Sequence, residues 1–334
     1  MDLKERIYAF SQLGKLLNKD FFNLHKEEMY SASVNNNWFT IRNIKIALES
    51  WSKSLTDEML SSWLEPYKLN DSKDVSNVLV IMAGNIPLVG FHDLLAVLIS
   101  GNHIIIKMSS NDNIILPAIL NELILIDSRF KQRISYIEEI ENIKFDAVIA
   151  TGNNNSAQYF DYYFKGAQKI IRKNRRSIAY LDGSENKQEL EGLAHDVFLY
   201  FGLGCRNVSK LFLPKGYDLD ILFQAFYTYS DIIKHNKYRN NYDYNKAIFL
   251  MGNNKLIENG FLLLKEEKSL YSPVSMLYYE YYVDRNTVDT FIKKNSKDLQ
   301  CIVSKNDTPF GYTQTPNLWD YADGIDTIHF LNQL

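Results

Sequence analysis

The spacing of apolar residues changes near residue 77, and this change divides the chain. Before it, apolar residues such as Ile44, Ala47 and Trp51 recur at helical intervals, so we expect helices over residues 1–68. After it, short runs that are apolar throughout alternate with helical stretches. Strands of this kind are buried on both faces, which is typical of a parallel sheet covered by helices. The pattern therefore predicts an α/β fold.

The helix-and-strand alternation falls into two blocks. In the first, strands are predicted over residues 77–84, 103–109, 145–152, 170–173 and 177–182, and helices over 91–100, 113–126 and 156–165. In the second, from about 187 to 309, we expect a helix over 187–201, a strand over 208–213, apolar runs at 245–252 and 275–282, a helix over 286–294 and a strand over 299–304. The tail ends in TIHFL (327–331), which we interpret as a final strand.

Composition narrows the class of protein. The 334 residues are 46% hydrophobic, enough for real cores, and the net charge of −3 offers no basic excess to attract nucleic acid or a membrane surface. No apolar run approaches the ~20 residues that a membrane span needs. The N-terminal MDLKERIYAF is charged where a signal peptide is apolar, and two cysteines do not make a disulfide framework. We therefore expect a cytoplasmic protein. The scattered histidines predict no metal site.

Cys205 is the strongest candidate for chemistry. It lies in GLGCRNVSKLFLP (202–214), on a glycine-rich turn between an expected helix and an expected strand. A thiol on such a turn can be reached by a substrate and act as a nucleophile. The other cysteine, Cys301, lies in the apolar run LQCIVS and is expected in a buried strand. The alternative for Cys205 is an inert buried thiol, which is what most free cysteines are.

Four further segments could take part in binding. Asn85 and Lys107 follow two expected strands, at the sheet edge where α/β proteins bind ligands, and ATGNNNSAQ (150–158) joins a strand to a helix N-terminus. The segment KIIRKNRRS (169–177) carries five positive side chains that could face phosphates. Each has a plainer interpretation: a turn-shaping asparagine, a solvated lysine, a helix cap and a solvated charged face. The glycine motifs of dinucleotide folds and phosphate-loop enzymes are absent from the sequence.

Five segments in this order resemble the aldehyde dehydrogenase superfamily, and most closely its LuxC-type acyl-CoA reductases. They are AGNIPLVGFHDLLAVLISGN, IIIKMSS, VIATGNNNSA, GLGCRNVSK and FGYTQTPNLWDYADGIDTIHFL. The resemblance implies two α/β domains with mostly parallel sheets and an active-site cleft between them. It runs from about residue 77 to the C-terminus and implies a nicotinamide-cofactor domain (70–186, completed by 310–334) and a catalytic domain (187–309) carrying the cysteine. The N-terminal helical segment (1–69), which the apolar spacing predicts, matches the family less clearly.

The resemblance also implies residue roles. Cys205 would be the nucleophile that attacks the acyl thioester, and Asn85 would form the oxyanion hole with the Cys205 backbone N–H. Cofactor-binding roles would fall to Lys107, Ser109, Ser110, Thr151, Gly152 and Asn153. Ser110 stands where NAD-preferring members often have a glutamate, which leans towards NADPH over NADH because a 2′-phosphate is not repelled.

The implied activity is reduction of a long-chain acyl-CoA to an aldehyde through an acyl-Cys205 thioester, with coenzyme A released. Oxidising members carry a Glu-Leu-Gly-Gly stretch whose glutamate activates water, and we match it here to AYLDGSE (179–185), which lacks that glutamate. A second departure is Ser269, where oxidising members have a glutamate on the nicotinamide ribose. The resemblance further implies a homo-oligomer, dimer or tetramer, and an acyl-supplying partner enzyme.

Three alternatives remain open from the sequence. The protein could be an oxidising aldehyde dehydrogenase, a cysteine acyltransferase or thioesterase that needs no nicotinamide, or a non-catalytic module that binds a nucleotide or coenzyme A. Whether Asp182 or His195 takes part in proton transfer is also open.

Overall fold

The computed structural model describes residues 1–69, 74–141 and 143–334, which form two compact units. The first unit contains Met1–Asn174 and Asn317–Leu334, and the second contains Arg175–Pro316. The boundaries lie at 174/175 and 316/317, whereas the sequence placed them at 186/187 and 309/310. The N-terminal helices belong to the first unit and do not form a segment of their own.

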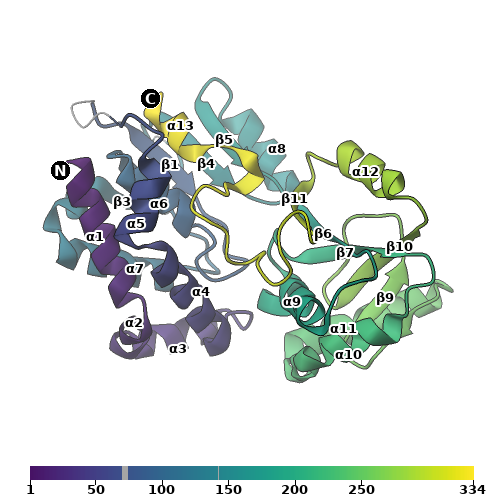
Figure 1. The fold of residues 1–334 in the computed structure, drawn as a ribbon. Coiled ribbons are helices and arrows are strands. Elements are labelled where there is room, and N and C mark those ends of the chain that lie inside the picture. The colour runs from purple at the N-terminus through teal and green to yellow at the C-terminus, as the bar shows by residue number, and fades with distance from the viewer. Residues whose placement is uncertain (70–73, 142) are drawn as a thin grey trace. The chain divides into compact units, whose positions relative to one another are not determined.

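Among the described residues, five parallel strands form the sheet of the first unit (Figure 1). From edge to edge they are β3 (Ile134–Ile137), β2 (His103–Lys107), β1 (Asn77–Ile81), β4 (Ala147–Thr151) and β5 (Gln168–Arg172). Both faces are buried: Leu79 faces a core that includes Val148 and Phe164, and its neighbours Val78 and Val80 are equally buried. This explains why the strands are apolar throughout. The chain reverses its direction of travel across the sheet beside β1, so a switch point lies between β1 and β4.

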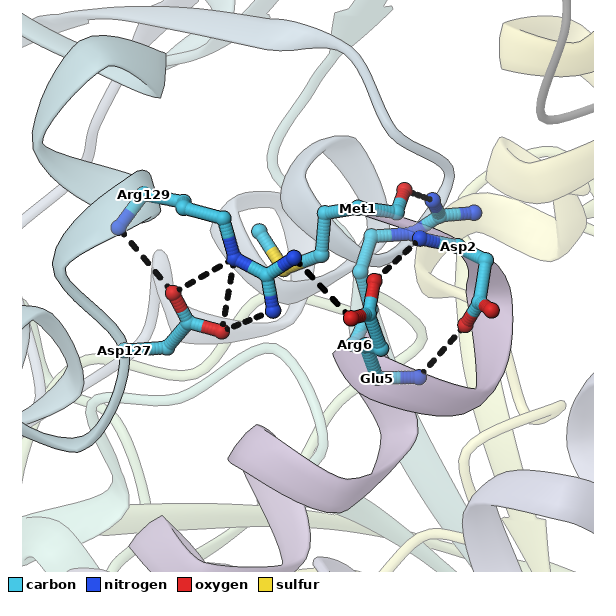
Figure 2. A network of polar contacts seen from close by, with 6 residues as sticks. All are labelled: Met1, Asp2, Glu5, Arg6, Asp127 and Arg129. Atoms are coloured by element: carbon cyan, nitrogen blue, oxygen red, sulfur yellow. Dashed lines mark hydrogen bonds and ion pairs between the residues drawn. The ribbon is translucent and has the colours of Figure 1, made fainter.

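Helices cover this sheet. They are α1 (Leu3–Leu16), α2 (Lys19–Leu24), α3 (Lys26–Asn35), α4 (Ile41–Ser54), α5 (Asp57–Leu64), α6 (Phe91–Ile99), α7 (Ile115–Ile126), α8 (Asn154–Tyr163) and α13 (Thr327–Asn332), with short 3-10 helices η1 (Ser128–Arg133) and η4 (Ala322–Gly324). Helix α1 packs against α4, α5, α6 and α7. Figure 2 shows its capped start, where Asp2 and Glu5 each accept the other's backbone N–H at 2.8 Å. In the same view Arg129 donates to Glu5 and Asp127, which ties α1 to the segment after α7.

The C-terminal segment folds back onto the first unit as a helix, so the prediction of a strand at 327–331 was wrong. Asp326 caps α13 by accepting the N–H of His329, and the buried residues Thr327, Ile328 and Leu331 have helical spacing. A five-residue apolar run cannot distinguish helix from strand by periodicity alone. Packing of this face against α6 decides the outcome.

The sheet of the second unit is also mostly parallel. Its described strands, in order, are β11 (Leu299–Val303), β6 (Arg176–Tyr180), β7 (Val208–Pro214), β10 (Met276–Tyr282), β9 (Leu263–Glu266) and β8 (Ile257–Glu258). Only the short edge strand β8 runs antiparallel, to β9, within the described residues. Strand β6 was expected in the first block, but its neighbours are β7 and β11.

The helices of the second unit are α9 (Lys187–Phe198), α10 (Leu219–Phe226), α11 (Asn236–Met251) and α12 (Arg285–Lys294), with 3-10 helices η2 (Leu199–Gly202) and η3 (Tyr227–Lys234). The apolar run at 245–252 lies mostly in α11. Along the described chain, no helix is long and apolar enough to cross a membrane.

Candidate active site

Three predicted segments follow neighbouring strands of the first sheet. Asn85 lies after β1, Lys107 ends β2, and Thr151 ends β4. Because β1 pairs in parallel with both β2 and β4, the carboxyl ends of all three lie on one edge of the sheet. The structure therefore brings the candidate binding residues of this unit to the edge that flanks the switch point, as α/β ligand sites require.

The loops after β1 and β2 pack closely against each other. A Cβ on Gly84 would lie 2.4 Å from the Ser109 Oγ and 3.1 Å from the Asp112 backbone N, so only glycine fits there. The Asp112 carboxylate accepts the backbone N–H of Leu88 at 3.1 Å, and Leu88 has a φ of 61°, in the left-handed region. The loop that carries the exposed Asn85 is thus held on both sides of that residue.

Asp112 is a buried carboxyl group that the sequence analysis missed. It is 3% exposed, and its Oδ1 has no hydrogen-bond partner in the described part of the chain. Burial raises the pKa of Asp112 to about 7, although the Leu88 N–H favours the charged form. In the sequence it is only an aspartate in a polar turn, because its burial depends on the loop after β1.

The predicted cofactor residues after β2 already make contacts within the protein. The Lys107 Nζ donates to the backbone carbonyl of Glu138 at 3.0 Å, just beyond β3, which differs from a fully solvated lysine. The Ser109 side chain occupies the space that a Cβ on Gly84 would need. Ser110 is exposed, and its carbonyl accepts from Asn35 at 3.3 Å.

The segment after β4 forms the start of α8. Asn153 caps this helix by accepting the Ser156 N–H at 2.9 Å, as the plainer interpretation predicted. A Cβ on Gly152 would lie 2.7 Å from the Ser156 Cβ, so strand and helix approach closely here. Close approach of backbone to a ligand and an exposed helix N-terminus are both features of phosphate-binding loops.

Cys205 belongs to the second unit, where it is a half-buried thiol that forms no disulfide, on the turn before β7. Asn207, which is 1% exposed, organises this turn: its Oδ1 accepts the Gly204 N–H at 2.8 Å, and its Nδ2 donates to the carbonyls of Asp196 and Leu199, both at 2.9 Å. An asparagine can serve both kinds of backbone group at once. The turn is therefore a fixed scaffold for the thiol.

The backbone before Cys205 is strained. Tyr200, Phe201 and Gly202 have φ values of 53°, 59° and 73°, so three successive residues are left-handed. For each non-glycine residue this costs on the order of 1–3 kcal/mol, and such strain is found preferentially at functional sites. It also ends α9 at Phe198, where the sequence predicted a helix to residue 201.

The stretch AYLDGSE does not lie next to Cys205. The Ser177 hydroxyl donates to the Cys205 carbonyl at 3.1 Å, and Ser177 pairs with Val208, so Cys205 lies at the amino edge of the sheet. Tyr180 ends β6 and Asp182 follows it, at the opposite edge. Matching this stretch to the glutamate motif was therefore wrong, because the residues beside Cys205 are those that begin β6.

Asp182 and His195 have other partners. Hydrogen bonds from Ser184 lower the pKa of Asp182 to about 2, and the Lys305 Nζ lies 3.5 Å away. The Nδ1 of His195 lies 2.7 Å from the Tyr229 hydroxyl. No group of three or more His, Cys, Asp or Glu side chains in the described ranges could hold a metal ion.

The basic segment at 169–177 is divided between the two units. Arg172 forms a buried ion pair with Asp93, with its Nη2 2.6 Å from the Asp93 Oδ1, and also donates to Thr327 at 2.9 Å and to the Ala322 carbonyl. It therefore fastens the C-terminal segment and is not available to phosphates. Arg176 begins β6 at the same edge as Cys205, and the spacing of charges along the sequence did not indicate this.

The chain is similar in sequence to known proteins. The sequence model of one family, described as acyl-CoA reductase (LuxC), matches residues 23–221, which include every predicted site residue. A long-chain acyl-protein thioester reductase 2 from Photobacterium leiognathi is 27% identical over 187 residues, which are 51% of this chain and 38% of that protein. The matched part thus spans less than two fifths of the length of that relative.

Solved structures show the fold. A Mycobacterium tuberculosis aldehyde dehydrogenase complexed with NAD+ is 11% identical with a TM-score of 0.66, over 91% of this chain and 73% of that one. An NAD-dependent benzaldehyde dehydrogenase from Corynebacterium glutamicum is 12% identical with a TM-score of 0.67, over 91% of this chain and 76% of that one. The predicted α/β fold of the aldehyde dehydrogenase type is confirmed.

Proposed function

The chain belongs to the LuxC family of acyl-CoA reductases, and we propose that it reduces a long-chain acyl thioester to the aldehyde with a nicotinamide cofactor. The observation that carries the proposal is the half-buried thiol of Cys205 on a rigid turn within the region that the family model matches. A half-buried thiol is accessible, and a turn fixed by Asn207 can hold it in one orientation for attack.

In the proposed reaction, the Cys205 thiolate attacks the carbonyl carbon of the acyl thioester. A new S–C bond forms, the old S–C bond breaks, and the donor thiol leaves as coenzyme A. Asn85 takes the proposed role of donating its side-chain N–H to the oxyanion, an interaction worth ~3–4 kcal/mol in comparable sites. After reduction, the thiohemiacetal loses the aldehyde and returns Cys205 to its thiolate.

The residues of the first unit fit a nicotinamide dinucleotide. The strand order provides a switch point beside β1, the close approach at Gly152 leaves no room for a side chain, and α8 presents its N-terminus there. Thr151, Gly152 and Asn153 would line the site, with Lys107, Ser109 and Ser110 near the adenosine ribose. When bound, the cofactor supplies the hydride. The absence of a carboxylate at Ser110 favours NADPH over NADH.

The substrate and assembly are part of the proposal. The acyl donor is a long-chain acyl-CoA, or the acyl group of a partner enzyme, as the name of the Photobacterium relative suggests for that protein. We further propose a homo-oligomer, dimer or tetramer.

Mass spectrometry of the intact protein mixed with palmitoyl-CoA tests the reaction. We expect an acyl adduct on Cys205 that disappears on addition of NADPH while aldehyde is released. Cys205→Ser should form no thioester that NADPH can remove, and Cys301→Ser, the matched control, should behave as the unmodified protein does. A wild-type protein that binds NADPH but forms no adduct would refute the proposal and favour a binding module.

A further inference from the structure

The amino edge of the second sheet gathers cations around the Cys205 turn. The Ser177 hydroxyl donates to the Cys205 carbonyl at 3.1 Å and accepts the Cys301 N–H at 3.1 Å, so this residue joins the turn to β6 and β11. Arg176 immediately precedes Ser177, and its backbone N–H is fixed by the Asp298 carbonyl at 3.0 Å. The register of the parallel strands therefore places Arg176 at the same edge as Cys205.

The guanidinium of Arg176 is partly withdrawn from water. Its Nε is buried and has no hydrogen-bond partner among the residues that the structure describes. Burial lowers the pKa of Arg176 below its usual range, and the charges of Cys205 and Tyr271 act in the opposite direction. Arg176 is half-buried, and a cation that is partly withdrawn from water is stabilised by an anion beside it.

Of the two groups whose charges act on Arg176, Cys205 is the one that can ionise near neutral pH. Burial and Asp298 raise the pKa of Tyr271 above its ordinary value of 10, so its hydroxyl is neutral at neutral pH. A thiol ionises much more readily, with an ordinary pKa of about 8.5. Electrostatic coupling is reciprocal: a thiolate that stabilises the guanidinium is stabilised equally by it.

We propose that Arg176 is a positioning residue that holds the Cys205 sulfur in its ionised, nucleophilic form before the substrate binds. The inference rests on the proposed role of Cys205 as the nucleophile. Acylation makes the sulfur neutral, so the same guanidinium also favours thiolate departure when the aldehyde is released. Arg176 acts through its charge alone: it forms and breaks no bond in the proposed reaction, and it neither gains nor loses a proton.

Other charged and titratable groups lie near this edge. The Arg206 Nη1 donates to the Cys301 Sγ at 3.3 Å, and the Arg175 Nη1 donates to the Leu299 carbonyl at 3.0 Å. The charged and titratable groups that can affect a pH titration of Cys205 from this edge are Arg175, Arg176, Arg206, Tyr271, Asp298 and Cys301.

The test is the rate at which iodoacetamide alkylates Cys205 between pH 5 and 10, with peptide mass spectrometry separating Cys205 from Cys301. In the wild type we expect the midpoint below the ordinary value of about 8.5. Arg176→Gln should raise the midpoint by about one unit or more, and Arg176→Lys should keep it nearer the wild type. The matched control Arg285→Gln removes an arginine that pairs with Asp289 in α12, and should leave the midpoint unchanged.

Two results would overturn the proposal. One is an unchanged midpoint in Arg176→Gln with the circular dichroism of the wild type. The other needs no variant and stands even if Arg176→Gln fails to fold: a wild-type midpoint at or above about 8.5. The alkylation assay contains neither thioester nor nicotinamide. A negative result in it therefore does not affect the acyl-adduct experiment on Cys205, and a negative result in the acyl-adduct experiment does not affect the alkylation assay.

Discussion

Asp112→Asn should change how the stability of the first unit depends on pH. The wild-type carboxyl is 3% exposed, and burial raises its pKa to about 7 from an ordinary 3.8. The folded state therefore binds this proton more tightly than the unfolded state does. The stability that Asp112 contributes is fully present below pH 3.8 and is lost as the pH rises through about 7.

The size of the effect follows from the two pKa values. Each pH unit between them changes the unfolding free energy by about 1.4 kcal/mol, so the wild type loses about 2–3 kcal/mol between pH 5 and pH 8 from this group alone. In Asp112→Asn, the amide oxygen can still accept the Leu88 N–H, and the added amide N–H₂ is buried at a cost of about 1–3 kcal/mol that does not vary with pH. Relative to the wild type, the variant should therefore gain about 2–3 kcal/mol between pH 5 and pH 8.

Tryptophan fluorescence during urea unfolding measures the unfolding free energy of the first unit, because all four tryptophans lie in that unit. They are Trp38, Trp51, Trp63 and Trp319. The control is Asp127→Asn, since the hydrogen bond from Arg129 lowers the pKa of Asp127 and places its titration below this pH range. If the stability difference between Asp112→Asn and wild type is the same at pH 5 and pH 8, the buried-carboxyl argument is refuted.

Three further substitutions test the scaffold. Asn207→Ala removes three hydrogen bonds from the Cys205 turn and should lower the stability of the second unit by about 3 kcal/mol; a circular-dichroism melt that matches the wild type would contradict this. Gly84→Ala should cost about 1–3 kcal/mol of stability and weaken NADPH binding by calorimetry, and adding Ser109→Gly should restore part of the stability, because the new Cβ meets that side chain. Asp93→Ala leaves Arg172 buried without its carboxylate and should cost about 3–5 kcal/mol in urea unfolding, whereas replacing both with leucine should cost less.

Local pattern was sufficient for most of the fold. The apolar strands between residues 77 and 182 and the helices among them are present, with bounds that differ by a few residues. Strand β3 was missed, since its pattern ISYI is only half-buried at the sheet edge. The C-terminal helix was missed because six residues carry too little periodicity, and its buried face is defined only by packing on α6.

The sequence by itself determined the α/β class, the family, and the thiol on a glycine-rich turn, because each of these is written in local spacing or in contiguous motifs. Tertiary structure alone decided which polar groups are buried and which segments share an edge. Asp112 becomes a buried acid only when the loop after β1 covers it, and Arg176 comes to the same sheet edge as Cys205 only when β6 pairs with β7. Both depend on contacts between residues that are distant along the chain, and burial and charge proximity are properties of those contacts rather than of sequence spacing.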